Sequence, residues 1–147
     1  MKSTIYQIYP KSFKDSNGDG IGDLKGVIEK IDYLKNLGVD YLWLTPFYMS
    51  PQNDNGYDVK DYKNIDPGFG TIEDFENLVK KAKENNIEIM LDLVLNHTST
   101  EHIWFQKALR GDEKYKNYYI FKKPKEGKVP TNWQSKFGGS AWEYVEA

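Results

Sequence analysis

The stretch that decides the fold of this 147-residue chain runs from residue 87 to residue 97 and reads Ile87-Glu88-Ile89-Met90-Leu91-Asp92-Leu93-Val94-Leu95-Asn96-His97. Its near-continuous apolar residues predict a strand over 87–95 in a parallel sheet. Asp92 needs a partner there, because burying an unpaired charge is costly. Strand alternation places Asp92 and Asn96 on one face, with His97 just past the strand end.

Two earlier segments read as shorter strands, 5–9 and 41–44, and each is closed by a proline. Apolar residues recur at helical spacing over 24–37. After the second strand a long polar loop runs to Thr71, where another helix starts; its apolar residues over 72–82, Ile72 and Val79 among them, are expected on its buried face. A capping-box pattern at 98–101 predicts a third helix over 104–109. The order β-α-β-α-β-α predicts an α/β fold with a parallel sheet and helices packed outside it.

The pattern stops at Gly111, and the tail to residue 147 is rich in Lys, Pro, Gly and Tyr. We therefore expect an α/β part over 1–110 and an irregular excursion or small inserted domain over 111–147.

Composition excludes several classes of function. Twenty Lys or Arg against 22 Asp or Glu leave a net charge of −2, which argues against a nucleic-acid partner. No cysteine is present, so disulfides and thiolate metal sites are excluded. No signal peptide follows Met1, and no apolar run approaches the roughly 20 residues that span a membrane. We expect a soluble cytoplasmic protein with no membrane partner.

A loop from Asp15 to Asp23 carries oxygen donors at alternating positions, namely Asp15, Asn17, Asp19, the Ile21 carbonyl and Asp23. This spacing suits a hard cation and predicts structural Ca²⁺, with Mg²⁺ as a substitute. The twelfth position is Gly26 rather than the glutamate of an EF-hand. A polar turn without metal is the alternative.

A second polar loop, 50–59, contains Tyr57 next to Asp58, the combination with which proteins hold a sugar ring and its hydroxyls. An ordinary surface loop is the alternative. A structural role for His97 is as reasonable as a functional one. The other histidine, His102, is expected to be exposed on the helix that follows.

Taken together, these segments resemble glycoside hydrolase family 13, the α-amylase superfamily, and its α-glucosidase branch. The resemblance covers essentially the whole chain and rests on the segments 5–10, 15–23, 43–46, 55–58, 92–97 and 132–142. Within that branch, 45–48 and 133–139 are most similar to the α,α-phosphotrehalases, which cleave trehalose 6-phosphate. Oligo-1,6-glucosidases are the nearest alternative.

The resemblance implies the first three βα units of a TIM barrel, with 111–147 beginning the domain inserted after strand three. It implies that Tyr57 stacks on the glucosyl ring, that Asp58 holds the terminal hydroxyls and that His97 binds the 6-hydroxyl. Asp92 would belong to the network around the nucleophile. The family's Ca²⁺ ligands fall on Asp15, Asn17, Asp19, Ile21 and Asp23, and no organic cofactor is implied.

The family's catalytic residues have no counterparts among the residues of this chain. The family's retaining mechanism needs an Asp nucleophile and a Glu acid–base, which normally follow strands four and five. A full barrel takes about 250 residues. We therefore expect an N-terminal fragment that carries sugar-binding parts and is inactive alone. A non-catalytic carbohydrate-binding relative and a calcium-binding module remain alternatives.

Overall fold

The structure is a computed structural model that describes residues 3–145. Its contacts divide the chain into two compact units, one that ends at Thr100 and one that begins at Glu101. The division precedes Gly111, where the sequence pattern changes. The assignment of 111–147 to an inserted domain stays a prediction.

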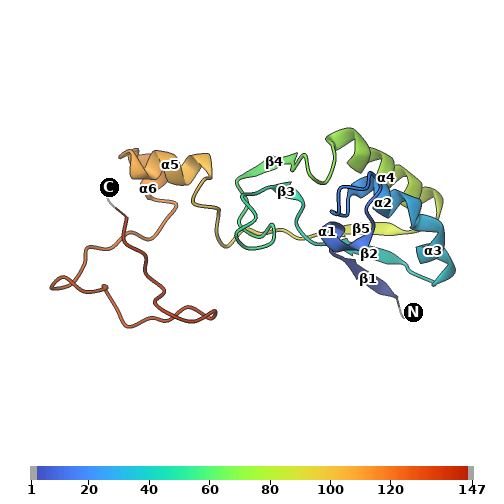
Figure 1. The fold of residues 1–147 in the computed structure, drawn as a ribbon. Helices are drawn as coiled ribbons and strands as arrows, with labels where there is room; N and C mark the ends of the chain where they lie inside the picture. The colour runs from blue at the N-terminus through green and yellow to red at the C-terminus, as the bar shows by residue number, and fades with distance from the viewer. Residues whose placement is uncertain (1–2, 146–147) are drawn as a thin grey trace. The chain divides into compact units, whose positions relative to one another are not determined.

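Three parallel strands form the sheet of the first unit (Figure 1). They pair in the order β1-β2-β5, with bounds β1 Ile5–Ile8, β2 Tyr41–Leu44 and β5 Glu88–Leu91. The register aligns Gln7 of β1 with Trp43 of β2 and Met90 of β5. The parallel sheet predicted from the alternation of elements is therefore confirmed.

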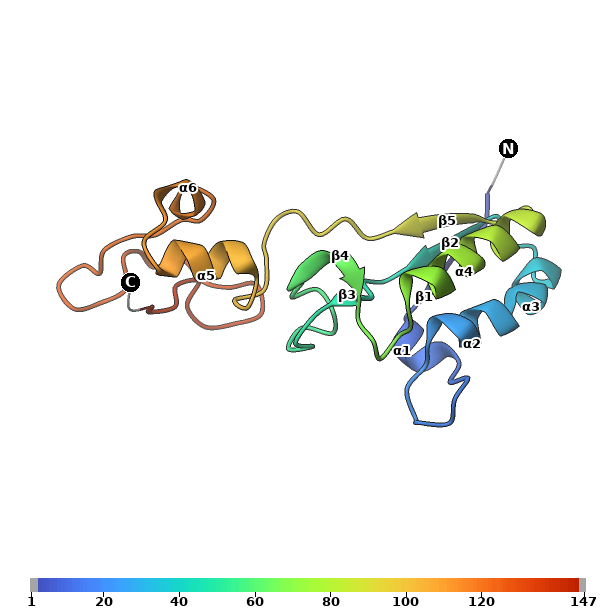
Figure 2. The same cartoon turned by 90° about the horizontal axis from the view of Figure 1, so that it is seen from above.

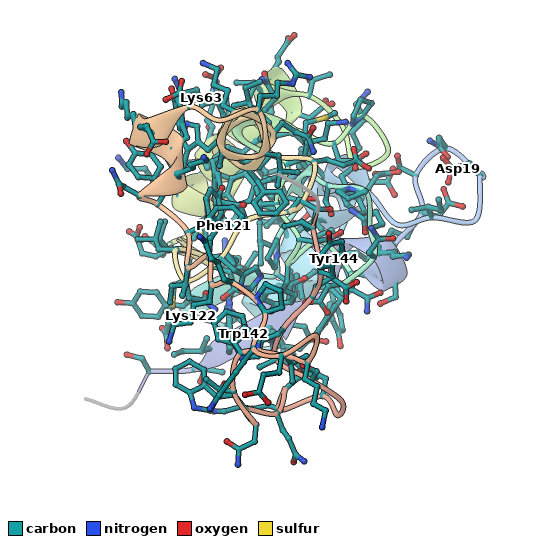
Figure 3. All side chains as sticks on the ribbon, turned by 90° about the vertical axis from the view of Figure 1, so that its left-hand side faces the viewer. Asp19, Lys63, Phe121, Lys122, Trp142 and Tyr144 are labelled. Atoms are coloured by element: carbon teal, nitrogen blue, oxygen red, sulfur yellow. The ribbon has the colours of Figure 1, made fainter. Side chains whose placement is uncertain are left out.

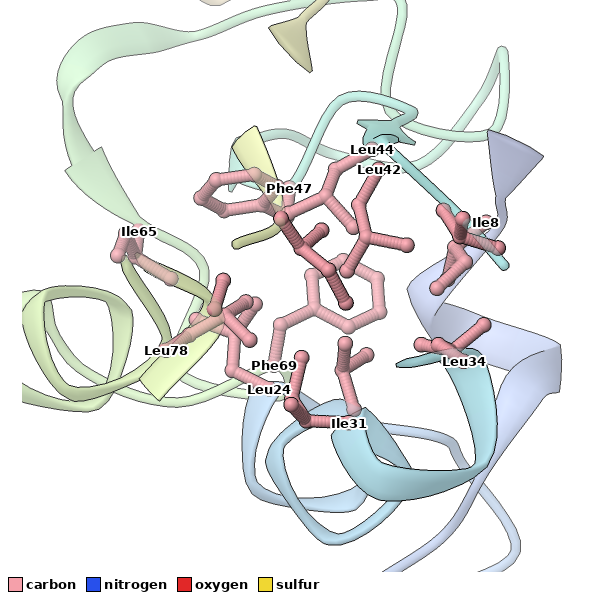
Figure 4. Packing of buried hydrophobic residues seen from close by; sticks show 14 residues of the cluster. Ile8, Leu24, Ile31, Leu34, Leu42, Leu44, Phe47, Ile65, Phe69 and Leu78 are labelled. Carbon is pink, nitrogen blue, oxygen red and sulfur yellow. The ribbon is translucent and has the colours of Figure 1, made fainter. Parts of the chain in front are cut away.

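Helices cover one face of this sheet, as Figure 2 shows. They are α1 Pro10–Phe13, α2 Leu24–Glu29, α3 Ile31–Asn36 and α4 Ile72–Glu84. Alternate β2 residues Leu42 and Leu44 point to the helices and are fully buried (Figure 4). Trp43, between them, lies on the opposite face. These four helices thus leave uncovered the face of the sheet that carries Trp43.

Three expectations for this unit need correction. The helix expected over 24–37 is two short helices, because the backbone turns at Lys30, whose N–H bonds Val27 O at 3.0 Å. The third strand ends at Leu91 instead of residue 95, so Asp92 and Asn96 lie outside it. Ile72 and Val79, expected in the buried face of α4, are 47% and 37% exposed.

The segment between β2 and α4 was expected to be a loop, but it contains a small antiparallel sheet. Its strands are β3 Tyr48–Met49 and β4 Asp61–Ile65. Thr71 begins α4 as expected, with a capping box in which Thr71 and Asp74 bond each other's backbone N–H.

The second unit begins with two helices, α5 Ile103–Leu109 and α6 Glu113–Lys116. The N-cap of α5 is His102, not the expected Thr98, and His102 is 5% exposed, so its expected exposure is also wrong. The described residues after α6 form no regular strand, only bridges between Lys125 and Lys128 and between Gln134 and Ser140. Among residues 3–145, no helix has the length and apolar character to cross a membrane.

Candidate functional site

Asp92, directly after β5, is the centre of the candidate site. Its Oδ1 accepts a hydrogen bond from Trp43 Nε1 at 2.8 Å, and its Oδ2 accepts one from the Tyr57 hydroxyl at 2.7 Å. The carboxylate therefore has the partners that its position requires, supplied by β2 and by the loop 50–58. Trp43 lies in the segment 43–46, for which the sequence predicted no site residue. Trp43 alternates with Leu42 and Leu44 along the strand, and this alternation was the sequence signal that its side chain lies on the other face of the sheet.

Tyr57 is held as a hydrogen-bond donor. Burial, then the hydrogen bond to Asp92 and the Asp92 charge, raise the pKa of the Tyr57 phenol well above its usual value of 10. The nearby Tyr9, just after β1, adds to this rise. Residues that follow β1, β2 and β5 thus come together, as the carboxyl ends of parallel strands should. Burial and the Asp92 charge likewise raise the pKa of Tyr48.

His97 lies against the backbone of the same loop. Its Nε2 is 2.9 Å from the Tyr57 carbonyl oxygen, and its Nδ1 is 2.9 Å from Asn96 Nδ2. His97 is exposed, so one side of the ring is open to solvent. The predicted residues Tyr57, Asp92 and His97 are therefore brought together.

Asp58 has a different environment. Its Oδ1 accepts hydrogen bonds from Ser50 Oγ at 2.8 Å and Asp54 N at 3.0 Å, and its Oδ2 accepts one from Asn53 N at 2.8 Å. Although burial raises the pKa of Asp58, these bonds lower it overall. This carboxylate therefore closes the loop 50–58 on itself.

Asp54 is the exposed carboxylate of that loop, and sequence reasoning did not single it out. Its charge is the smallest of the causes that raise the pKa of Tyr57. Gly56, between them, has φ +95°, and a Cβ there would lie 2.7 Å from the Pro46 carbonyl oxygen. Glycine is therefore needed to bring the loop against the end of β2.

The loop 15–23 forms a separate group in the first unit, and Figure 3 shows Asp19 on it. Asp15 accepts hydrogen bonds from the backbone N–H groups of Asn17, Gly18 and Gly20. These bonds lower the pKa of the Asp15 carboxyl. Asn17 Oδ1 and Asp19 Oδ1 accept from backbone N–H groups two residues further on, so the turn is tightly ordered.

Asp23 connects this loop to helix α2. Its Oδ1 caps α2 by accepting from Gly26 N at 2.6 Å, while its Oδ2 accepts from Ser16 N and Ser16 Oγ. Burial raises the pKa of Asp23, and these hydrogen bonds outweigh it and lower the pKa overall. A Cβ on Gly26 would lie 1.9 Å from the Lys14 carbonyl oxygen, which explains glycine where an EF-hand has glutamate.

The donor types of this loop fit a hard cation, since all are carboxylate, amide or carbonyl oxygens. The carboxylates of Asp15 and Asp23 lie close enough for the Asp15 charge to act on Asp23. Among the described residues, however, no three Asp, Glu or His side chains are arranged to hold a metal ion. The donors fit by chemistry, while their present hydrogen bonds are to the loop itself.

Comparison with known proteins identifies the family. Residues 7–147 match the alpha amylase catalytic domain. The chain is 62% identical to "Trehalose-6-phosphate hydrolase" of Bacillus subtilis (strain 168) and 56% identical to "Oligo-1,6-glucosidase" of Bacillus cereus, in both cases over 99% of this chain. The crystal structure of Bacillus licheniformis trehalose-6-phosphate hydrolase matches 97% of this chain with a TM-score of 0.92 and 56% identity.

The chain spans about a quarter of the length of these relatives, 26% in each case. The resemblance inferred from the motifs is therefore confirmed at the level of the family.

Proposed function

The chain belongs to the alpha amylase catalytic-domain family, and from this premise we propose that it is part of a retaining α-glucosidase and carries that enzyme's sugar-binding residues. One observation carries the proposal: a tyrosine, a carboxylate and a histidine meet after the parallel strands, where Asp92 accepts from both Tyr57 and Trp43. Aromatic faces beside polar side chains are typical of sugar sites.

We propose trehalose 6-phosphate as the substrate, cleaved to glucose and glucose 6-phosphate. Two relatives named trehalose-6-phosphate hydrolase, at 62% and 58% identity, support this choice. Isomaltose-type substrates are the alternative, because oligo-1,6-glucosidases reach 56% identity.

The three βα segments of the first unit correspond, in this proposal, to the first three units of an eight-stranded barrel. Residues 111–147 begin the domain inserted after the third strand. Chemistry in such barrels takes place at the carboxyl ends of the strands, where Tyr57, Asp92 and His97 lie.

Each of these residues has a proposed part in holding the glucosyl group. Tyr57 stacks on the sugar ring, and His97 binds the 6-hydroxyl by exchanging for it the contact of its Nδ1 with Asn96. Asp92 keeps the Tyr57 ring in place through the hydroxyl at 2.7 Å. Asp58, with three hydrogen bonds from its own loop, shapes that loop, while the exposed Asp54 is the second carboxylate available to the hydroxyls.

Hydrolysis needs an Asp nucleophile and a Glu acid–base, and in this proposal neither is among the 147 residues. The purified chain should therefore release no glucose from trehalose 6-phosphate and no nitrophenol from p-nitrophenyl α-glucoside. Turnover by the pure chain would refute this division of parts.

A chimera tests the substrate. Residues 3–145 would replace the matching segment of the Bacillus subtilis relative, and trehalose 6-phosphate and isomaltose would be compared by kcat/KM. We expect activity with preference for trehalose 6-phosphate. An active chimera that prefers isomaltose would favour the alternative, and an inactive but folded one would contradict the proposed sugar site.

Within that chimera, Asp54→Asn and Asp58→Asn form a matched pair. If Asp54 binds hydroxyls and Asp58 orders the loop, Asp54→Asn raises KM with unchanged thermal stability, whereas Asp58→Asn lowers the melting temperature. Loss of affinity only in Asp58→Asn would restore the direct role that the resemblance implies for Asp58.

We further propose that Ca²⁺ is held by Asp15, Asn17, Asp19, the Ile21 carbonyl and Asp23, and that it stabilises the loop after β1. The cation would neutralise the carboxylates of Asp15 and Asp23. Calorimetry with Ca²⁺ should show binding that Asp19→Ala abolishes. Absence of heat, together with unchanged stability in Asp19→Ala, would leave a turn closed by its own hydrogen bonds.

The cytoplasmic location and the absence of nucleic-acid and membrane partners stay predictions.

A further inference from the structure

Two segments of the first unit, 57–62 and 92–99, lie side by side without pairing as strands. Ser99 N donates to Val59 O at 2.9 Å, and His97 Nε2 is 2.9 Å from Tyr57 O. The Tyr57 hydroxyl also donates to Asp92 Oδ2, at 2.7 Å. The sugar-binding residues thus depend on how these two segments are held together.

Tyr62, on β4, makes a further connection between the two segments. Its hydroxyl oxygen lies 2.7 Å from Val94 O and 2.8 Å from His97 O. Both carbonyls can only accept, so the single phenolic proton is shared between them in a three-centre hydrogen bond. A single hydroxyl therefore fixes both ends of the turn that leads from the buried Val94 to His97.

This turn has little support of its own. It follows the end of β5 and lies outside regular structure, and Leu95 N donates to Leu93 O. The side chains of Leu93 and Leu95 are 73% and 74% exposed, so apolar packing anchors the turn only through Val94. Tyr62 is therefore well placed to decide the position of His97.

The contacts of the His97 ring specify its protonation. A carbonyl oxygen cannot donate, so Nε2 must carry the proton that it shares with Tyr57 O. The Asn96 amide nitrogen donates, so Nδ1 must be an acceptor. These two contacts correspond to the Nε2–H tautomer, with both nitrogens engaged.

We propose that Tyr62 is a positioning residue of the sugar site: by binding the carbonyls of Val94 and His97, its hydroxyl holds the His97 ring in the Nε2–H tautomer against Tyr57. The part that concerns sugar rests on the proposed function, whereas the part that concerns His97 stands on the contacts alone.

The test uses the full 147-residue chain labelled with ¹⁵N. The chain has only two histidines, so His97→Gln assigns both ring spectra. In the unmodified chain, long-range ¹H–¹⁵N spectra should show His97 protonated at Nε2. Tyr62→Phe keeps the ring next to Tyr48, 6.1 Å between centroids, and removes only the hydroxyl. We expect His97 in that variant to become a mixture of tautomers while His102 is unchanged.

Tyr33→Phe is the matched control, since Tyr33 is 53% exposed and lies on α3. It should leave both histidine spectra unchanged. A His97 ring protonated at Nδ1 in the unmodified chain would overturn the proposal, as would a folded Tyr62→Phe with the original His97 spectrum. If Tyr62→Phe does not fold, the unmodified chain alone tests the proposal. A His97 ring protonated at Nε2 and close to the Tyr62 ring would support it, and any other result would overturn it.

A glucose titration of the same samples tests the link to sugar. Tyr57 and His97 resonances should move with glucose, and Tyr62→Phe should weaken this binding roughly fivefold, the value of one net hydrogen bond. If the tautomer changes as expected but glucose does not bind the unmodified chain, the positioning role holds and the proposed function fails. Equal glucose affinity in the unmodified chain and in Tyr62→Phe would show that Tyr62 affects only the structure of the turn, and would overturn its role in the sugar site.

Discussion

The two units of the chain are built by different means. Among the described residues, the buried hydrophobic side chains lie in the first unit, except for Ala108. In the second unit, Phe137 is 95% exposed, Tyr144 is 78% exposed and Ile120 is 75% exposed. A core of aliphatic side chains under a sheet therefore stabilises the first unit, and the second must rely on local contacts.

Those local contacts are mainly aromatic. Trp133 and Trp142 stack with centroids 5.9 Å apart, and Lys122 Nζ lies 5.8 Å from each ring centroid. Figure 3 labels Lys122 and Trp142. The charges also differ: residues 1–100 contain 11 Lys or Arg against 16 Asp or Glu, whereas residues 101–147 contain nine against six. The buried core thus lies in the first unit, which also holds the proposed sugar site.

The largest effect is expected from Leu42→Ala in β2. Leu42 is fully buried in the core, and the cavity should cost about 2–5 kcal/mol of unfolding free energy. Hydrogen exchange read by mass spectrometry should show lost protection in peptides of residues 3–100. Phe137→Ala is the control, because its side chain is almost fully exposed and should cost under about 0.5 kcal/mol. Comparable costs for both would abolish the contrast between the units.

Gly26→Ala should cost about 1–3 kcal/mol, because the new Cβ would meet the Lys14 carbonyl oxygen, a backbone atom that cannot turn aside. Chemical denaturation in the presence of a chelator measures this. Gly68→Ala is the matched control, since its Cβ would meet only the Asp66 side chain at 3.3 Å. A stable Gly26→Ala would show that α2 can move away from the segment 10–14, and that the loop 15–23 is less closely packed than the contacts indicate.

Asp23→Asn should cost about 1 kcal/mol at pH 7, because an amide cannot accept from both Gly26 and Ser16. The folded-state pKa of Asp23 is lowered from 3.8, so its contribution is present above that value and is lost as the pH falls through the folded-state pKa. Unfolding curves from pH 6 to pH 2 with chelator should therefore be less steeply pH-dependent in the variant. Glu76→Gln, on the exposed side of α4, should keep the original dependence. An unchanged pH profile in Asp23→Asn would show that Asp23 does not contribute to the loss of stability of the first unit in acid.

Local sequence patterns predicted the parallel sheet because buried strands and helical stripes are visible in apolar spacing. The break at Lys30 and the early end of β5 were not predictable, because apolar residues continue through both points. Leu93 and Leu95 look like strand residues, yet they are exposed. The short pairing of β3 with β4 also escaped prediction, because it joins Tyr48 to Ile65 across a long polar loop.

Some residues of the candidate site could likewise be predicted from the sequence, and others could not. Tyr57, Asp92 and His97 were predicted from residue type and position at strand ends. Trp43 and Tyr62 were not, because their roles depend on partners 49 and 32 to 35 residues away. The hydrogen bonds of Asp58 come from its own loop, and residue type alone could not separate that use from sugar binding.

The smallest effect is expected in the second unit, from His102→Ala. His102 Nδ1 accepts from Trp104 N at 3.1 Å and so caps α5, and the ring meets Trp104 edge-on at 4.9 Å. Loss of the cap should cost about 1 kcal/mol, seen as roughly fivefold faster hydrogen exchange over 103–109. His102→Asn should restore much of the protection, because asparagine is a favoured N-cap. Since the first unit has its own core, its peptides should exchange as before. Equal loss of protection in residues 3–100 would mean that the two units unfold together, and that the second contributes to the stability assigned above to the first alone.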